Sequence, residues 1–86
     1  MTNVQESIRK VLAENGRLAV PAESLDSQAD LFAVGLDSLA IVNVLMSLEE
    51  RFDIELPDSM LSRRSFANIA TIEGIVTTLV NQTADA

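Results

Sequence analysis

Two neighbouring residues of this chain could do chemistry, Asp37 and Ser38, in the pentapeptide Gly35-Leu36-Asp37-Ser38-Leu39. No glycine or proline follows until after Phe52, so residues 38–52 have the length and composition of a helix of about four turns. A serine hydroxyl at the start of such a helix can carry an ester-linked group. A phosphodiester would suit the position, because the positive end of the helix dipole and the free backbone N–H groups stabilise an anion there.

The same two residues have a purely structural explanation. Asp37 or Ser38 can cap the helix, because the side-chain oxygen of either residue can accept a hydrogen bond from an unpaired N–H of the first turn. Gly35 ends the segment that precedes them. On these residues alone, capping and attachment both stay open.

The sequence offers no clear base that could activate Ser38 for catalysis. The chain has neither histidine nor cysteine, which removes disulfides, thiol nucleophiles, the usual base at neutral pH and the commonest zinc ligands. The single lysine, Lys10, falls in the first predicted helix, and nothing in the sequence brings it to Ser38. We therefore predict no metal site and no enzyme, and a serine hydrolase is the weakest interpretation.

Length and composition indicate one small globular domain over residues 1–86. A hydrophobic content of 48% in 86 residues supplies a single core. The formal net charge of -7, from 13 acidic and 6 basic residues, disfavours binding to nucleic acid and to anionic membranes. No apolar run has the length of a membrane span, and the N-terminus lacks the pattern of a signal peptide, so we expect a cytoplasmic protein. We also expect a monomer.

The first half of the chain predicts one helix and one long connection. The helix is expected over roughly the first fifteen residues, capped by Thr2 or Asn3 and stopped at Asn15-Gly16. A long ordered loop from Arg17 to Asp37 follows, with a single helical turn near Leu31. The apolar residues expected to pin this loop to the core are Leu18, Val20, Leu25, Leu31 and Phe32.

The second half predicts three further helices. After the helix that begins at Ser38, a short helix is expected from Asp58 or Ser59 through Arg64, and a last helix begins at Thr71 with Thr71 as its cap. Residues 83–86 are expected to fray. The predicted fold is all-α, a four-helix bundle with a long loop between the first and second helices and a short third helix.

The second predicted helix has two apolar faces. At about 100° per residue, one face forms a core stripe, which consists of Ile41, Val44, Leu45, Leu48 and Phe52. Leu39, Val42 and Met46 fall on another side, where they would either dock partner proteins or pack within the bundle.

Asp37-Ser38-Leu39 resembles the modification motif of acyl carrier proteins and of the related peptidyl and aminoacyl carrier proteins. Other segments also stand in the order and spacing of that family: Asp30-Leu31-Phe32, residues 48–57 and Thr71-Ile72-Glu73. The resemblance implies the acyl carrier protein fold, with 4'-phosphopantetheine attached to Ser38 and Asp37 as the preceding motif residue. The arm ends in a thiol, so cargo would be held as a thioester. The implied partners are a phosphopantetheinyl transferase, a loading enzyme and a downstream acceptor enzyme.

Two departures from the carrier proteins of fatty-acid synthesis narrow the resemblance. Ala40 and Asn43 stand where those proteins normally have acidic residues. Arg63 and Arg64 form an unusual basic pair, which is either solvated surface or a contact for an acidic partner. Both departures argue against the standard fatty-acid partner set.

Three stretches, residues 9–18, Asn43-Val44 and residues 58–66, are similar to small stand-alone bacterial aminoacyl carrier proteins. That resemblance implies loading with glycine or alanine by an amino acid:carrier protein ligase, a truncated relative of seryl-tRNA synthetases. An acyl carrier protein of a specialised lipid or polyketide pathway is the alternative. A helical interaction module without a prosthetic group is an alternative of another class, and it predicts that Ser38→Ala is harmless.

Overall fold

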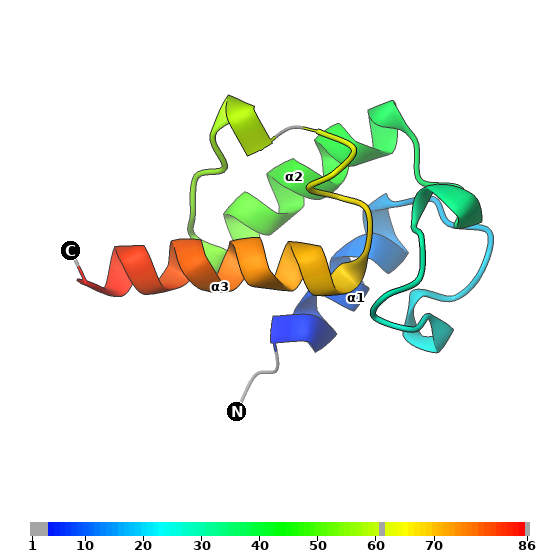
Figure 1. Cartoon of the computed structure of the whole chain (residues 1–86), viewed down its shortest axis with the longest axis horizontal. Helices are drawn as coiled ribbons and strands as arrows, with labels where there is room; N and C mark the ends of the chain where they lie inside the picture. The colour runs from blue at the N-terminus through cyan, green and yellow to red at the C-terminus, as the bar shows by residue number, and fades with distance from the viewer. Residues whose placement is uncertain (1–3, 61, 86) are drawn as a thin grey trace.

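The computed structural model describes residues 4–60 and 62–85 of the chain, without the side chains of residues 58 and 82–85. Within these residues three α-helices occur and no strand: α1 (Val4–Asn15), α2 (Ser38–Phe52) and α3 (Ile69–Asp85). The connections contain three short 3-10 turns: η1 (Ala22–Ser24), η2 (Phe32–Val34) and η3 (Asp58–Met60) (Figure 1). The predicted all-α class is confirmed, and so are the bounds predicted for α2.

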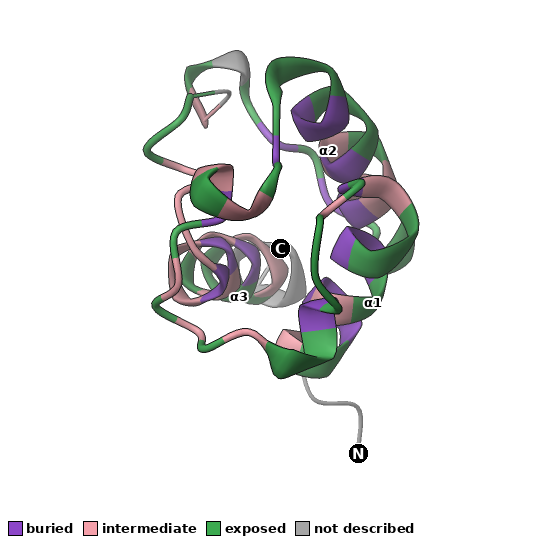
Figure 2. Ribbon diagram, turned by 90° about the vertical axis from the view of Figure 1, so that its right-hand side faces the viewer, coloured by how far each residue is buried: buried purple, intermediate pink, exposed green. Residues whose placement is uncertain are grey.

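The core lies between the three helices, because each helix turns an apolar face inward (Figure 2). From α1 it takes Ile8, Val11 and Leu12, from α2 Ala40, Ile41, Val44 and Leu48, and from α3 Ile69, Ile72 and Val76. Leu45 and Phe52 are half-buried and pack against this cluster. The core stripe predicted for α2 is therefore confirmed. No helix of the described residues combines the length and the apolar character that crossing a membrane requires.

An arginine of α1 fastens the long connection between α1 and α2. Arg9 Nη1 donates hydrogen bonds to the carbonyl oxygen of Ala22 at 2.8 Å and to that of Leu25 at 2.6 Å. Its Nη2 donates to Gln5 Oε1, one turn earlier on α1, at 3.1 Å. The guanidinium group thus holds η1 against α1.

These bonds also explain one wrong prediction. Val20 was expected to pin the connection to the core, yet 39% of its surface is exposed. The hydrogen bonds from Arg9 bring Ala22 inward instead, and this residue is only 2% exposed. The predicted turn near Leu31 is confirmed as η2, and Leu31 itself is fully buried.

The short third helix predicted through Arg64 is not confirmed. Of the residues described there, 58–60 form the 3-10 turn η3, and residues 62–68 form turns and bends. The Ser62 hydroxyl oxygen accepts a hydrogen bond from the N–H of Ser65 at 3.3 Å. Such a local bond from a side chain to the backbone competes with helical hydrogen bonding.

The start of α3 also differs from the prediction. The helix begins at Ile69, and Asn68 Oδ1 accepts a hydrogen bond from the N–H of Thr71 at 2.8 Å. Asn68 is therefore the capping side chain, and Thr71 lies within the first turn. The predicted end of α1 at Asn15 is confirmed, the proposed caps Thr2 and Asn3 lie outside the described residues, and fraying of residues 83–86 stays a prediction.

Candidate functional site

Ser38 is the first residue of α2, and it is exposed. The residue before it, Asp37, is the N-cap: its backbone is extended, and its Oδ1 accepts a hydrogen bond from the N–H of Ala40 at 2.8 Å. The aspartate side chain therefore caps the helix. Of the two functions that the sequence left open for this pair, capping falls to Asp37, and the Ser38 hydroxyl is accessible for attachment.

Gly35 sets the course of the chain just before this pair. It ends η2 with a left-handed backbone conformation (φ 113°), which side chains other than glycine strain. A Cβ atom here would lie 3.4 Å from the backbone nitrogen of Ala19 and 3.5 Å from the carbonyl oxygen of Arg17. Next to it, Leu36 is buried, and its N–H donates to the Leu31 carbonyl oxygen at 3.0 Å. The backbone that leads into Ser38 is thus closely packed.

A hollow of about 240 Å³ opens beside Ser38. It is lined by Ser38, Ile41 and Val42 from α2 and by Ser62 and Arg63 from the turns that follow η3. The carbon at the centre of the Arg63 guanidinium lies 4.2 Å from the centroid of the Phe32 ring. No local sequence pattern indicates that Arg63 lies next to Ser38, because packing of distant segments brings the two together.

The other member of the basic pair is placed differently. Arg64 is exposed, and the hollow beside Ser38 does not include it among its lining residues. Arg63 is exposed as well, so the two arginines differ in that only Arg63 lines the hollow and lies over Phe32.

The apolar residues predicted on the outer side of α2 are exposed. The exposed fractions are 65% for Leu39, 46% for Val42 and 60% for Met46. They do not belong to the buried core, so packing in the bundle does not explain them. Because they follow Ser38 along one side of the same helix, they form an apolar surface next to the residue that carries the hydroxyl, which we call the α2 patch.

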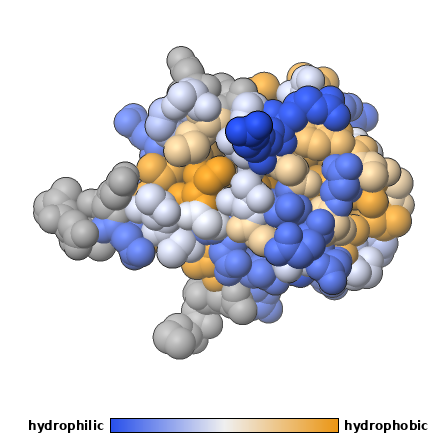
Figure 3. Space-filling model, viewed as in Figure 1, coloured by the Kyte–Doolittle hydropathy of each residue, from blue (hydrophilic) through white to orange (hydrophobic). Residues whose placement is uncertain are grey.

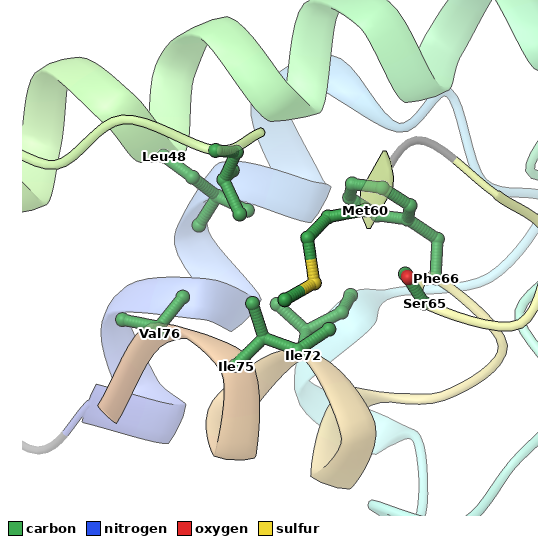
Figure 4. A pocket seen from close by; sticks show the side chains of 8 residues that line it. Leu48, Met60, Ser65, Phe66, Ile72, Ile75 and Val76 are labelled. Carbon is green, nitrogen blue, oxygen red and sulfur yellow. The ribbon is translucent and has the colours of Figure 1, made fainter. Parts of the chain in front are cut away.

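A small cavity lies between α2, α3 and the segment that joins them. Leu48, Met60, Phe66, Ile72, Ile75 and Val76 point toward one another around it (Figure 4). Its volume is about 10 Å³, close to the least that admits a water molecule. The bundle as folded has no internal space for a long acyl chain at this place.

A wider groove of about 630 Å³ lies between α3 and the Pro57–Met60 segment, and apolar atoms are visible above α3 in Figure 3. Ser38 is not among its lining residues. Among the described residues no group of three or more histidine, cysteine, aspartate or glutamate side chains is placed to hold a metal ion.

Comparison with known proteins gives consistent matches. A family model described as the phosphopantetheine attachment site matches residues 6–79. The aminoacyl carrier protein of Agrobacterium fabrum (strain C58) is 47% identical over 70 residues, which cover 81% of this chain and 84% of that protein. The acyl carrier protein of Campylobacter hominis is 36% identical over 78 residues, which cover 91% of each chain.

Solved structures show the same likeness. One matching chain comes from the crystal structure of an engineered Bradyrhizobium japonicum glycine:carrier protein ligase complexed with carrier protein from Agrobacterium tumefaciens and AMP. That chain is 45% identical, with a TM-score of 0.81 and coverage of 85% of this chain and 97% of the other. A solution structure of a protein from Agrobacterium tumefaciens is 41% identical, with a TM-score of 0.74 and coverage of 95% and 99%.

Proposed function

The chain belongs to the phosphopantetheine attachment-site family, and from this we propose that Ser38 carries a 4'-phosphopantetheine arm. The start of α2 supports Ser38 as the attachment site, because Asp37 caps the helix and Ser38 is exposed. The first turn of a 15-residue helix favours the negative charge of a phosphodiester at this position. Asp37 then serves as the motif residue that fixes the helix start beside the attachment point.

The arm supplies a thiol, on which cargo is held as a thioester, whereas the polypeptide itself contains no cysteine. The family is one of carrier proteins and not of catalysts. We extend this to the chain and propose that it has no catalytic activity of its own. Its residues position the arm and present it to enzymes that load and unload it, in the cytoplasm.

For the cargo we propose a small amino acid, glycine or alanine, loaded by an amino acid:carrier protein ligase. The support comes from the 47% identical aminoacyl carrier protein and from the 45% identical chain in a structure with a glycine:carrier protein ligase. The cavity of about 10 Å³ between α2 and α3 agrees with a small cargo, because it offers no room for a long chain at this place. An acyl cargo of a specialised lipid or polyketide pathway is the second candidate, supported by the 36% identical acyl carrier protein.

We propose the α2 patch, Leu39, Val42 and Met46, as the surface that partner enzymes bind. Apolar side chains that are exposed next to an attachment point give a partner contact area close to the group on which it acts. The adaptable methionine side chain suits contact with several partners in turn: the phosphopantetheinyl transferase, the ligase and the acceptor enzyme. We propose that Arg63 and Arg64 contact acidic groups of a partner.

The experiment that tests the carrier function is the intact mass of the protein after incubation with coenzyme A and a broad-specificity phosphopantetheinyl transferase. Wild type and the control Ser59→Ala, an exposed serine of η3, should each gain one phosphopantetheine, and Ser38→Ala should gain none. Folded wild type without added mass would contradict the proposal and favour a helical interaction module.

The modified protein then tests the cargo. Incubation with a glycine:carrier protein ligase, ATP and either glycine or alanine should add the mass of one aminoacyl group to wild type. Acceptance of acyl groups alone, with no loading of either amino acid, would favour the acyl carrier alternative.

A further inference from the structure

We propose that the hollow beside Ser38 is a docking site for the phosphate end of the chain's own arm, and that Arg63 binds the phosphate. The inference rests on the proposed attachment of the arm to Ser38. Ser38 and Arg63 line the same hollow, although 25 positions separate them in the sequence. A group esterified to the hydroxyl therefore starts inside a space that already contains a cation.

The guanidinium group of Arg63 is held in place by an aromatic ring. It lies over Phe32 at 4.2 Å, and Phe32 packs against the core from η2. A ring covers one face of the guanidinium plane and leaves the N–H groups at its edge able to donate. Arg63 makes no ion pair with a carboxylate among the side chains that the structure describes. It therefore remains available to an anion.

The two segments that form the stack are fastened to each other by the backbone. The N–H of Leu31, next to Phe32, donates to the carbonyl oxygen of Ala67 at 2.9 Å. The N–H of Ala70 donates to the carbonyl oxygen of Ser27 at 2.9 Å. The first bond joins the connection before Ser38 to the bend that follows the turns with Arg63, and the second joins it to the first turn of α3 (Figure 1). The guanidinium is thus positioned before any phosphate arrives, so less conformational entropy is lost on binding.

Charge complementarity favours a phosphate as the bound group. The chain carries a formal net charge of -7, and a phosphodiester adds one more negative charge at Ser38. An arginine beside that position offsets the added charge and can donate two parallel hydrogen bonds to phosphate oxygens. A hydrogen bond between charged partners is about twice as strong as one between neutral groups.

The remaining walls suit the part of the arm that follows the phosphate. Ile41 and Val42 present aliphatic side chains to the hollow, and the carbon next to the phosphate-bearing methylene of the arm carries two methyl groups. The hollow is open to solvent, so the phosphate and the dimethyl segment can lie in it while the thiol end of the arm extends outward, where enzymes reach it.

The test compares the unmodified and modified forms of isotope-labelled protein by NMR, without any partner enzyme. On modification, the side-chain Nε–H signal of Arg63 should shift while that of Arg64 stays in place. Nuclear Overhauser contacts should connect the methyl groups of the arm with those of Ile41 and Val42. These readouts report the position of the arm and do not depend on loading activity.

Matched variants separate a specific contact from a general effect of charge. Arg63→Gln should move the phosphorus NMR signal of the phosphodiester and abolish the contacts of the arm with Ile41, whereas Arg64→Gln removes the same charge one residue away and should leave both unchanged. Phe32→Leu, which keeps the guanidinium but removes the ring beneath it, should weaken the same contacts. If Arg63→Gln did not fold, Phe32→Leu and the shifts of the wild-type signals would still test whether Arg63 binds the phosphate.

The outcomes distinguish the two levels of the proposal. Wild type that gains the mass of the arm but shows no Arg63 shift and no contact of the arm with Ile41 or Val42 would overturn the docking site and leave the carrier function intact. Equal effects of Arg63→Gln and Arg64→Gln would overturn the specific role of Arg63. Wild type that gains no mass would overturn the carrier function and, with it, this inference.

Discussion

Asp37 accepts a hydrogen bond from the N–H of Ala40 through its Oδ1 at 2.8 Å, so the cap of α2 and the candidate attachment hydroxyl belong to two different residues. Esterification of the hydroxyl need not break the cap. The same relationship allows the stability of the helix and the modification of Ser38 to be altered separately.

Removal of the cap should destabilise the fold by an amount typical of a lost N-cap. Asp37→Ala is expected to lower the free energy of unfolding by about 1 kcal/mol, because one N–H of the first turn loses its acceptor. Asp37→Asn keeps an acceptor oxygen and should stay close to wild type. Urea denaturation of the three proteins measures the differences, and equal midpoints for Asp37→Ala and wild type would show that the cap contributes nothing.

Arg9 should matter for stability far more than its neighbour in α1. Arg9→Gln is expected to cost about 1.5–3 kcal/mol, because it removes charged hydrogen bonds to the carbonyl groups of Ala22 and Leu25. Lys10→Gln, a loss of the same charge from an exposed side chain, should change stability by less than about 0.5 kcal/mol. Urea denaturation compares the two variants. Similar losses in both would attribute the effect to net charge and not to the bonds with η1.

Two glycines should respond to alanine in opposite directions. Gly35→Ala should destabilise the protein by about 1–3 kcal/mol, because φ is 113°, a left-handed backbone conformation that strains any residue with a side chain. Gly74→Ala meets no atom within 4 Å and lies inside α3, so it should stabilise the protein by about 0.5–1 kcal/mol. Thermal and urea unfolding measure both, and a neutral Gly35→Ala would contradict the left-handed conformation.

The α2 patch should govern loading and not folding. Met46→Glu is expected to raise the KM of a ligase for the modified carrier at least several-fold, because a charge enters an apolar contact, and the unfolding midpoint should stay near that of wild type. Val20→Glu places the same charge at an exposed apolar residue outside α2 and serves as the control. Unchanged loading of Met46→Glu would assign the ligase contact to another surface.

The sequence predicted those features that depend on local periodicity. The bounds of α2, the end of α1 at Asn15 and the outward position of Leu39 and Met46 follow from apolar spacing and from Gly16. The candidate serine came from a short motif and the helix after it. All of these are set by residues within a few turns of one another.

The features that the sequence did not predict depend on contacts between distant segments or on competing local bonds. The Arg9 bonds that bury Ala22 instead of Val20, and the stack of Arg63 on Phe32, join residues far apart in the chain. The missing third helix reflects the bond from Ser65 to the Ser62 hydroxyl. The cap of α3 does have a local signal, since asparagine before an apolar run is a common cap, but Thr71 carries a similar signal three residues later and only the structure distinguishes them.

The closed interior between α2 and α3 has a consequence for the lifetime of the cargo. With a volume of about 10 Å³, this cavity cannot enclose a loaded group. Exclusion of water is the usual means of protecting a reactive group from hydrolysis, so an aminoacyl thioester that stays outside this cavity gains no such protection from it. The acceptor enzyme must therefore take the aminoacyl group from the carrier faster than water hydrolyses the thioester. The rate of hydrolysis thus sets the slowest rate at which the acceptor enzyme can work.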